Sequence, residues 1–263
     1  MEPHEAGGLY NALQLTGKFT AFKDLTKQNG FLFYIPAWNT SRIDPVTGFV
    51  DFLKPKYTTI SDAKEFFDKF RKISYNTEED QFEFSFDYSD FTQKAYGTRT
   101  DWTICSVGEL RYRFNKKLNN NKGGYERRNV TEDLKELFKE YLIEFTSQAD
   151  LRGQICRDHP ADFFERLIVC LQILLSLRYS CPEDNADFIL SPVRATDNTF
   201  FSSDAAAAAG LPLPQDADAN GAYNIARKGL LVLRKIDDAE STKDWSTKLT
   251  NTEWLQFCQS DNE

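Results

Sequence analysis

The sequence predicts an α+β fold, because its strand and helix patterns follow one another in separate blocks rather than in strict alternation. From Phe82 to Tyr88, apolar side chains alternate with polar ones, which is typical of a half-buried strand. A long helix is expected from Pro160 to about Arg178, since apolar residues recur there at helical spacing and proline is favoured in the first turn. A further helix is expected to begin near Asn220, where helical spacing resumes after an acidic stretch.

Three elements are expected upstream of the Phe82 strand. A helix spans Phe19 to Asn29 and ends at Gly30, which suits a helix C-terminus. The short apolar run from Phe31 to Ile35 indicates a buried strand. Asp62 is expected to cap a helix that runs to about Ile73. The inner face of this helix would consist of Phe66, Phe67, Phe70 and Ile73.

Two strands and a helix are expected downstream of it. Trp102 and Ile104 start one strand, and apolar residues alternate with polar ones from Leu110 to Asn115 in the next. Thr131 is expected to cap a helix, because an apolar face at helical spacing follows it. Between the long helix and Pro214 the chain is expected to be irregular.

Composition limits the classes of function. The chain has 263 residues, of which 41% are apolar and 22 are Phe, so it can form a sizeable core. A net charge of −8 argues against a free-standing nucleic-acid binder, which usually carries a basic excess. Five Cys without a CxxC pair and only two His argue against zinc and suit a reducing cytoplasm. The polar N-terminus and the absence of a long apolar run predict a cytoplasmic protein without membrane association.

The stretch from Pro214 to Ala226 carries two carboxylates, Asp216 and Asp218, just before an apolar-periodic run. Alanines flank Asp218 and leave room for a ligand, and a carboxylate there would suit a hard divalent cation. The alternative is that Asp218 or Asn220 simply caps the helix. Spacing alone leaves both interpretations open.

Four stretches of the chain form an ordered set. They are Gly7-Gly8-Leu9 through Leu13-Gln14-Leu15-Thr16, then Phe33-Tyr34-Ile35-Pro36-Ala37 with Thr40-Ser41 and Pro45-Val46-Thr47-Gly48-Phe49-Val50, then Ser191-Pro192-Val193-Arg194 before Phe200-Phe201, and finally Pro214 to Ala226. In this order they resemble motifs of the type V-A CRISPR-associated, RNA-guided DNA endonucleases, and the last resembles the third RuvC motif. The resemblance runs from about Gly7 to the C-terminus, which implies that the chain is about the C-terminal fifth of such an enzyme.

The resemblance also implies a domain organisation. A Nuc-type α+β domain would be inserted between pieces of a RuvC-like (RNase H-like) α/β nuclease domain. Residues 1–46 would form the end of the second RuvC region, residues 47–212 the Nuc domain, and residues 213–263 the third RuvC motif and the C-terminal helices. Transposon-encoded relatives carry a zinc ribbon at this point, but this sequence lacks the cysteine pairs for one.

For the active site, the resemblance carries over Asp218 as the third of three acids that hold two Mg²⁺ ions. Asp216 matches a motif position outside that set. Arg178 matches a functional arginine of the Nuc domain, and a planar guanidinium suits a phosphate. The alternative is a cation favoured by the C-terminal dipole of the long helix. Ser180 and Asp187 match polar positions near that arginine, although Asp187 could equally be an ordinary turn residue.

A basic segment between residues 111 and 128 is a second candidate for nucleic-acid contact, because seven cations there outnumber a single acid. Tyr112 and Tyr125 could stack on unpaired bases. The alternative is a solvated hairpin tip, since Asn119-Asn120-Asn121 and Gly123-Gly124 indicate a turn. The seven cations are Arg111, Arg113, Lys116, Lys117, Lys122, Arg127 and Arg128.

The resemblance therefore predicts a hydrolase, the C-terminal Nuc/RuvC part of an RNA-guided DNA endonuclease that performs Mg²⁺-dependent phosphodiester hydrolysis in a prokaryotic cytoplasm. Its partners would be the DNA target strands, the guide RNA through the rest of a monomeric effector, and the N-terminal part of the same protein. The chain alone is expected to lack efficient nuclease activity, because it carries one of three expected acids. The alternatives are a non-catalytic DNA-binding module and a structural module that acts with a separate nuclease.

Overall fold

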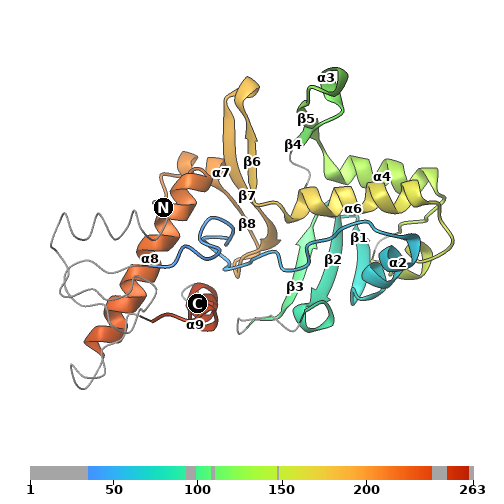
Figure 1. Ribbon diagram of the computed structural model, residues 1–263. Helices are drawn as coiled ribbons and strands as arrows, with labels where there is room; N and C mark the ends of the chain where they lie inside the picture. Colours follow the sequence, from blue (N-terminus) through green and yellow to red (C-terminus); the bar gives the residue numbers. More distant parts are fainter. Residues whose placement is uncertain (1–34, 93–98, 108–109, 147, 239–247, 261–263) are drawn as a thin grey trace.

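The computed structural model describes residues 35–92, 99–107, 110–146, 148–238 and 248–260. Within them the fold is α+β, as the sequence predicts, with small antiparallel sheets (Figure 1). The expected helix from Phe19 to Asn29 lies outside the described residues, as does all of the expected strand from Phe31 to Ile35 except Ile35. No helix in the described part of the chain is long and apolar enough to cross a membrane.

The main core lies between one sheet and two helices. Strands β1 (Lys72–Asn76), β2 (Gln81–Asp87) and β3 (Asp101–Cys105) pair antiparallel in that order. Helices α4 (Val130–Glu140) and α6 (Ala161–Leu175) pack against this sheet, and Figure 1 shows α6 running across it. The alternating phenylalanines of β2 are buried in this core, so the strand predicted there is confirmed.

Helix α2 (Ile60–Asp68) begins and ends earlier than predicted. Its N-cap is Thr59, whose hydroxyl accepts a hydrogen bond from the backbone amide of Asp62 at 3.1 Å. The prediction that Asp62 caps this helix is therefore wrong. The helix does not reach Ile73, because Ile73 pairs with Phe84 in the β1–β2 ladder.

Helix α4 is also capped differently from the prediction. Its N-cap is Asn129 rather than Thr131, and the Asn129 side chain accepts a hydrogen bond from the amide of Glu132 at 3.2 Å. The hydroxyl of Thr131 is buried and donates to the backbone carbonyl of Ser106, just after β3. Because its hydroxyl bonds to Ser106 outside the helix, Thr131 does not cap α4, and Asn129 does.

Helix α6 follows the short helix α5 (Arg152–Ile155) and ends at Leu175, earlier than predicted. Ser176 has an extended backbone, with ψ of 126°, and Arg178 begins a strand instead of ending the helix. Tyr179 explains this change of direction, because it is buried and its hydroxyl donates to the carbonyl of Ile173 at 2.5 Å. The extended backbone brings this ring back against the last turn of the helix.

A three-stranded antiparallel sheet occupies the region that the sequence predicted to be irregular. It consists of β6 (Arg178–Cys181), β7 (Ala186–Arg194) and β8 (Phe200–Ser202), and helix α7 (Ser203–Ala208) packs beside it. The prediction failed because β7 is buried over five consecutive residues. A strand buried on both faces does not alternate between apolar and polar residues.

The basic segment forms a separate two-stranded hairpin. Strands β4 (Arg111–Asn115) and β5 (Gly124–Arg128) pair antiparallel and are joined through the short turn α3 (Leu118–Asn121). Asn119, Asn120 and Asn121 have positive φ angles, which asparagine tolerates better than most residues. The predicted turn is therefore confirmed, and Figure 1 shows the hairpin projecting from the rest of the fold.

The described chain ends in helices α8 (Ala217–Asp237) and α9 (Asn251–Ser260). Apolar spacing predicted a helix in the region of α8, but several of those apolar residues face outwards. Ile225, Leu230 and Leu233 are 38%, 55% and 49% exposed. We call these three residues the apolar stripe of α8.

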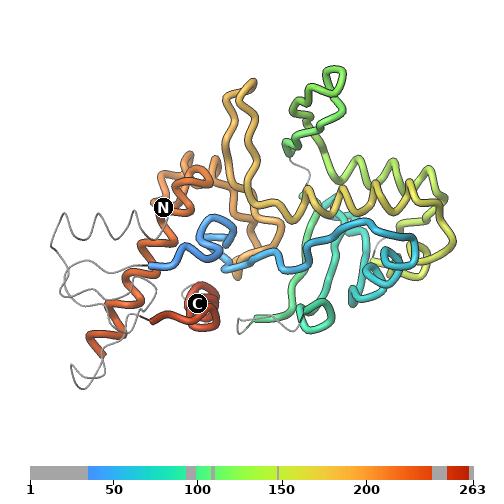
Figure 2. Tube along the Cα trace, in the orientation of Figure 1, coloured from blue at the N-terminus to red at the C-terminus, as the bar shows by residue number. Residues whose placement is uncertain are grey.

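The face of α8 that packs inwards is polar. Asn224 Nδ2 donates to the carbonyl of Thr40 at 2.9 Å. Lys228 Nζ donates to the carbonyls of Pro36 and Trp38 at 2.9 and 2.8 Å. These bonds fix the loop before residue 45 against α8. Figure 2 shows that this segment starts beside α8 and then crosses the molecule to α2.

Candidate active site

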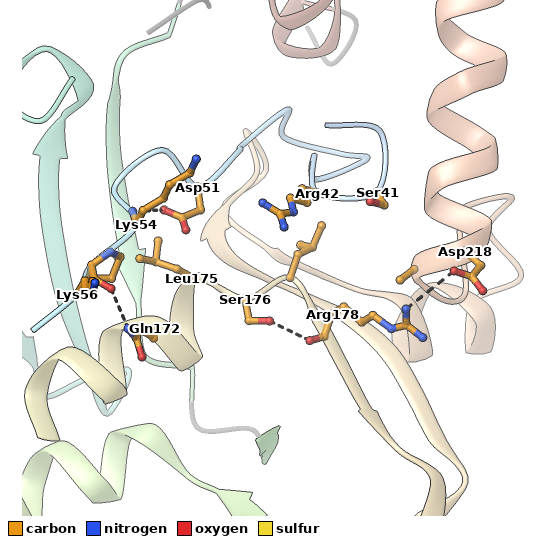
Figure 3. Close-up of a pocket in the computed structure, with 13 residues that line it drawn as sticks. Ser41, Arg42, Asp51, Lys54, Lys56, Gln172, Leu175, Ser176, Arg178 and Asp218 are labelled. Atoms are coloured by element: carbon orange, nitrogen blue, oxygen red, sulfur yellow. Dashed lines mark hydrogen bonds and ion pairs between the residues drawn. The ribbon is translucent and has the colours of Figure 1, made fainter. Parts of the chain in front are cut away.

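An open cleft of about 730 Å³ lies where the end of α6, the start of β6, the start of α8 and the segment between residues 41 and 56 meet (Figure 3). Arg178 and Asp218, which belong to different motifs of the sequence, line this same cleft. The other lining residues are Ser41, Arg42, Asp51, Lys54, Pro55, Lys56, Gln172, Leu175, Ser176, Leu177 and Ala217.

Arg178 reaches the cleft from the first position of β6. Its NH2 lies 3.0 Å from Asp187 Oδ2, and its NH1 lies 3.9 Å from Asp218 Oδ1. In the β6–β7 ladder Arg178 is opposite Ile189 and Ser180 is opposite Asp187. Arg178 and Asp187 are therefore diagonal neighbours on one face of the sheet, close enough for long side chains to meet. The antiparallel register thus places Asp187 beside Arg178, whose guanidinium lies at the start of α8.

The two carboxylates of the acidic stretch have different roles. Asp216 is the N-cap of α8, and its Oδ1 accepts a hydrogen bond from the amide of Ala219 at 2.7 Å. The helix therefore starts before Asn220, and neither Asp218 nor Asn220 caps it. Asn220 is buried and donates to the carbonyl of Ile43 at 2.9 Å. The side chain of Asp218 is 95% exposed in the first helical turn, where the helix dipole favours negative charge.

The ion pair between Arg178 and Asp218 is loose. The two side chains are 46% and 95% exposed, and exposed pairs contribute little to stability because water screens them. Arg178 can therefore turn towards an incoming anion while Asp187 keeps the guanidinium near the cleft. A phosphate placed there would accept two parallel hydrogen bonds from one guanidinium.

Asp187 and Ser180 both lie in strands. Asp187 belongs to β7, so its interpretation as a loop turn residue is wrong. Its ion pair with Arg178 fits a residue that orients the arginine. Ser180 is opposite Asp187 in the ladder and is half-buried. The dipole interpretation of Arg178 is wrong as well, because Arg178 lies in a strand and not at a helix end.

The basic hairpin does not line the cleft, and three of its seven cations are engaged within the fold. Arg111 is fully buried and its guanidinium donates to a tyrosine hydroxyl, so its assignment to nucleic-acid contact is corrected. Arg127 and Arg128 form ion pairs with Asp184 and Asp133 at 2.9 and 2.7 Å. Arg113, Lys116, Lys117 and Lys122 have exposed or half-exposed side chains and form no such ion pair with another described residue.

The cleft contains three cations that sequence reasoning missed. Arg42, Lys54 and Lys56 are exposed and line the cleft together with Arg178. The only local signal was a pair of lysines around Pro55. Nothing in the linear spacing indicated that they meet Arg178, because the fold alone brings these segments together.

The described residues do not complete a metal site. Among them, no three His, Cys, Asp or Glu side chains gather in a way that could hold a metal ion. Asp216 is occupied by the helix cap, which leaves Asp218 as one oxygen ligand facing the cleft. One carboxylate rarely holds Mg²⁺ without further ligands. A magnesium site at Asp218 would need oxygen ligands from other residues.

In this α+β fold, an arginine oriented by one carboxylate and a second, exposed carboxylate share one open cleft. A family model described as NUC, Nuclease domain, matches residues 43–205, which is more than half of the chain. The chain belongs to this family of nuclease domains. The matched residues include Arg178, Ser180 and Asp187 and end before Asp218.

Proposed function

We propose that this chain is the C-terminal, Nuc-containing part of a type V-A CRISPR-associated, RNA-guided DNA endonuclease. Residues 47–212 are assigned to the Nuc domain, and residues 1–46 and 213–263 to the RuvC-like domain around it. The family match supports nuclease chemistry, and the ordered motifs on both sides of the match support this type of enzyme.

The observation that carries the proposal is the shared cleft. Arg178 belongs to the nuclease-domain match, whereas Asp218 belongs to the acidic motif that follows it. Their nearest charged atoms are 3.9 Å apart. Two motifs that are separate in the sequence thus bring a cation suited to phosphate and a carboxylate suited to a metal ion to one place, which supports phosphodiester hydrolysis.

In the proposed reaction Arg178 binds the non-bridging oxygens of the scissile phosphate and offsets the negative charge that develops in the transition state. Asp187 keeps the guanidinium in place through its 3.0 Å contact. Asp218 would supply one oxygen ligand to a site for two Mg²⁺ ions, and other carboxylates would have to complete that site.

A non-catalytic DNA-binding or structural module that acts with a separate nuclease is the second candidate. The apolar stripe of α8 favours it, because exposed apolar surface on a helix often marks a docking site. The two candidates differ in whether the cleft residues matter for cutting or only for assembly.

Reconstitution tests the proposal. The chain is mixed with the N-terminal part of the parent enzyme, guide RNA and target DNA in the presence of Mg²⁺. The expected result is guide-directed cleavage that requires the chain, and no efficient cutting by the chain alone, because the chain carries one of three expected acids. Equal cleavage when the chain is left out would contradict the proposal and favour the second candidate.

A further inference from the structure

Four cations line the candidate active-site cleft of a chain that is acidic overall. The net charge is −8, yet the cleft holds Arg42, Lys54, Lys56 and Arg178 against only two carboxylates. Arg42, Lys54 and Lys56 are exposed, and none of them forms an ion pair within 4 Å in the described part of the chain, although Asp51 interacts electrostatically with Arg42 and Lys54. A charged cleft focuses its field, so it attracts anions while the rest of the surface repels them.

Hydrogen bonds fix the backbone of the segment that carries Lys54 and Lys56. Asp51 Oδ1 accepts hydrogen bonds from the amides of Leu53 and Lys54 at 2.9 and 3.2 Å. These bonds hold Lys54 at a φ of 46°, a left-handed conformation that lysine rarely adopts. Gln172 Nε2 on α6 donates to the carbonyl of Pro55 at 2.8 Å and ties the same segment to the main core. The lysines are therefore displayed on a fixed edge of the cleft.

Arg42 lies between these lysines and the Arg178 side of the cleft. The next residue, Ile43, is buried, and its carbonyl accepts the 2.9 Å hydrogen bond from Asn220 on α8. Figure 3 shows Arg42 between Asp51 on one side and Asp218 on the other, with its guanidinium in the open space of the cleft. Lys54, Lys56, Arg42 and Arg178 thus all line the same cleft.

The cleft suits a single strand bound through its phosphates. None of the described residues that line it is aromatic, so the bases have no stacking surface there. Cations that contact only the backbone bind without regard to sequence. The volume of about 730 Å³ lies in the range of small-ligand pockets, which is small for a double helix.

We infer that Arg42, Lys54 and Lys56 form a phosphate-binding track that leads a single DNA strand across the cleft to Arg178. The inference rests on the proposed function and adds the residues that hold the strand beside the scissile phosphate. It also assigns the principal DNA contact to the cleft rather than to the basic hairpin.

Binding of a fluorescent oligothymidylate to the purified chain, without Mg²⁺, tests the track independently of cutting. A cleft variant combines Arg42→Gln, Lys54→Asn and Lys56→Gln, and asparagine is chosen because it tolerates the left-handed backbone at Lys54. A control variant combines Lys116→Gln, Lys117→Gln and Lys122→Gln on the hairpin and removes the same charge. Circular dichroism melting confirms that both variants fold.

The cleft variant should bind at least about tenfold more weakly at low salt, and its plot of log affinity against log salt should be shallower by about 2, since each phosphate contact contributes roughly 0.7. The hairpin variant should keep the native slope. An unchanged slope in the cleft variant, an equal loss in the hairpin variant, or no binding by the native chain would overturn the track. Equally tight binding of duplex DNA would overturn its preference for a single strand. None of these outcomes depends on whether the assembled enzyme cleaves.

Discussion

Arg178 NH1 lies 3.9 Å from Asp218 Oδ1, at the point where strand β6 approaches the first turn of helix α8. The other terminal nitrogen of the same guanidinium, NH2, lies 3.0 Å from Asp187 Oδ2. Arg178 therefore stands between a carboxylate fixed in a sheet and a carboxylate exposed at a helix start. Since the contact with Asp218 is the longer and more exposed of the two, it is the one that an incoming phosphate would replace.

Arg178→Ala should impair cutting by the assembled enzyme far more than its binding of target DNA. Loss of a charge-assisted contact to a reacting phosphate costs about 10²–10³ in rate. Arg178→Lys should recover only part of the activity, because an ammonium group cannot make the two parallel hydrogen bonds. The measurement is single-turnover cleavage of each strand beside binding affinity at one fixed salt concentration. Normal cutting of both strands by Arg178→Ala would refute the phosphate contact.

Asp187→Asn should reduce cutting about 10- to 100-fold, because the Arg178 guanidinium loses its charged partner and its orientation. As a positioning effect, the loss should fall mainly on kcat, with KM for DNA nearly unchanged. Asp187→Glu should restore part of the rate, since it keeps a carboxylate within reach. Equal rates in Asp187→Asn and the native enzyme would show that the ion pair has no part in catalysis.

The sequence predicted what local patterns determine and missed what distant contacts determine. The strand of alternating phenylalanines and the long helix after Pro160 were visible in the sequence. Arg178 was assigned to a helix end, because the turn after Leu175 contains neither Gly nor Pro and depends on the burial of Tyr179. The cations of the cleft were missed for the same reason, since Arg42 and Arg178 line one cleft only in the folded chain.

Lys228 should make stability depend on pH. Burial lowers the pKa of Lys228 to about 8 from its ordinary value of 10.5. Between these values the unfolded chain binds more protons than the folded chain, so the free energy of unfolding contributed by this residue rises with pH. Between these pH values, the unfolding free energy of the native chain should rise by about 1–2 kcal/mol relative to that of Lys228→Met. This is less than the full pKa shift of Lys228 implies, because its ammonium group keeps two carbonyl partners.

Urea denaturation of the native chain and Lys228→Met at pH 8 and at pH 10.5 provides the measurement. The comparison removes the titration of the tyrosines and of the cysteines other than Cys258, which interacts electrostatically with Lys228. A difference in unfolding free energy that stays constant with pH, or falls, would contradict the sign of this effect.

The apolar stripe of α8 should matter for assembly and not for folding of the chain. Leu230→Lys and Leu233→Lys remove exposed leucines, so the unfolding free energy should change by less than about 0.5 kcal/mol. Binding to the N-terminal part of the proposed parent enzyme should weaken about tenfold or more, as expected when an interface contact is lost. Leu211→Lys, at a residue that is 52% exposed outside α8, is the matched control. Native affinity in both stripe variants would exclude the stripe from the interface.

The two carboxylates of the acidic motif give the most direct test of the central claim, which is that Asp218 and Arg178 act together in one active site. Asp216→Asn and Asp218→Asn each remove one charge at positions two residues apart, and asparagine caps a helix as well as aspartate does. In single-turnover cleavage by the assembled enzyme, Asp218→Asn should lose at least about 10² in rate, whereas Asp216→Asn should cut at nearly the native rate. A native cleavage rate in Asp218→Asn, or an equal loss in both variants, would contradict the assignment of Asp218 to the reaction.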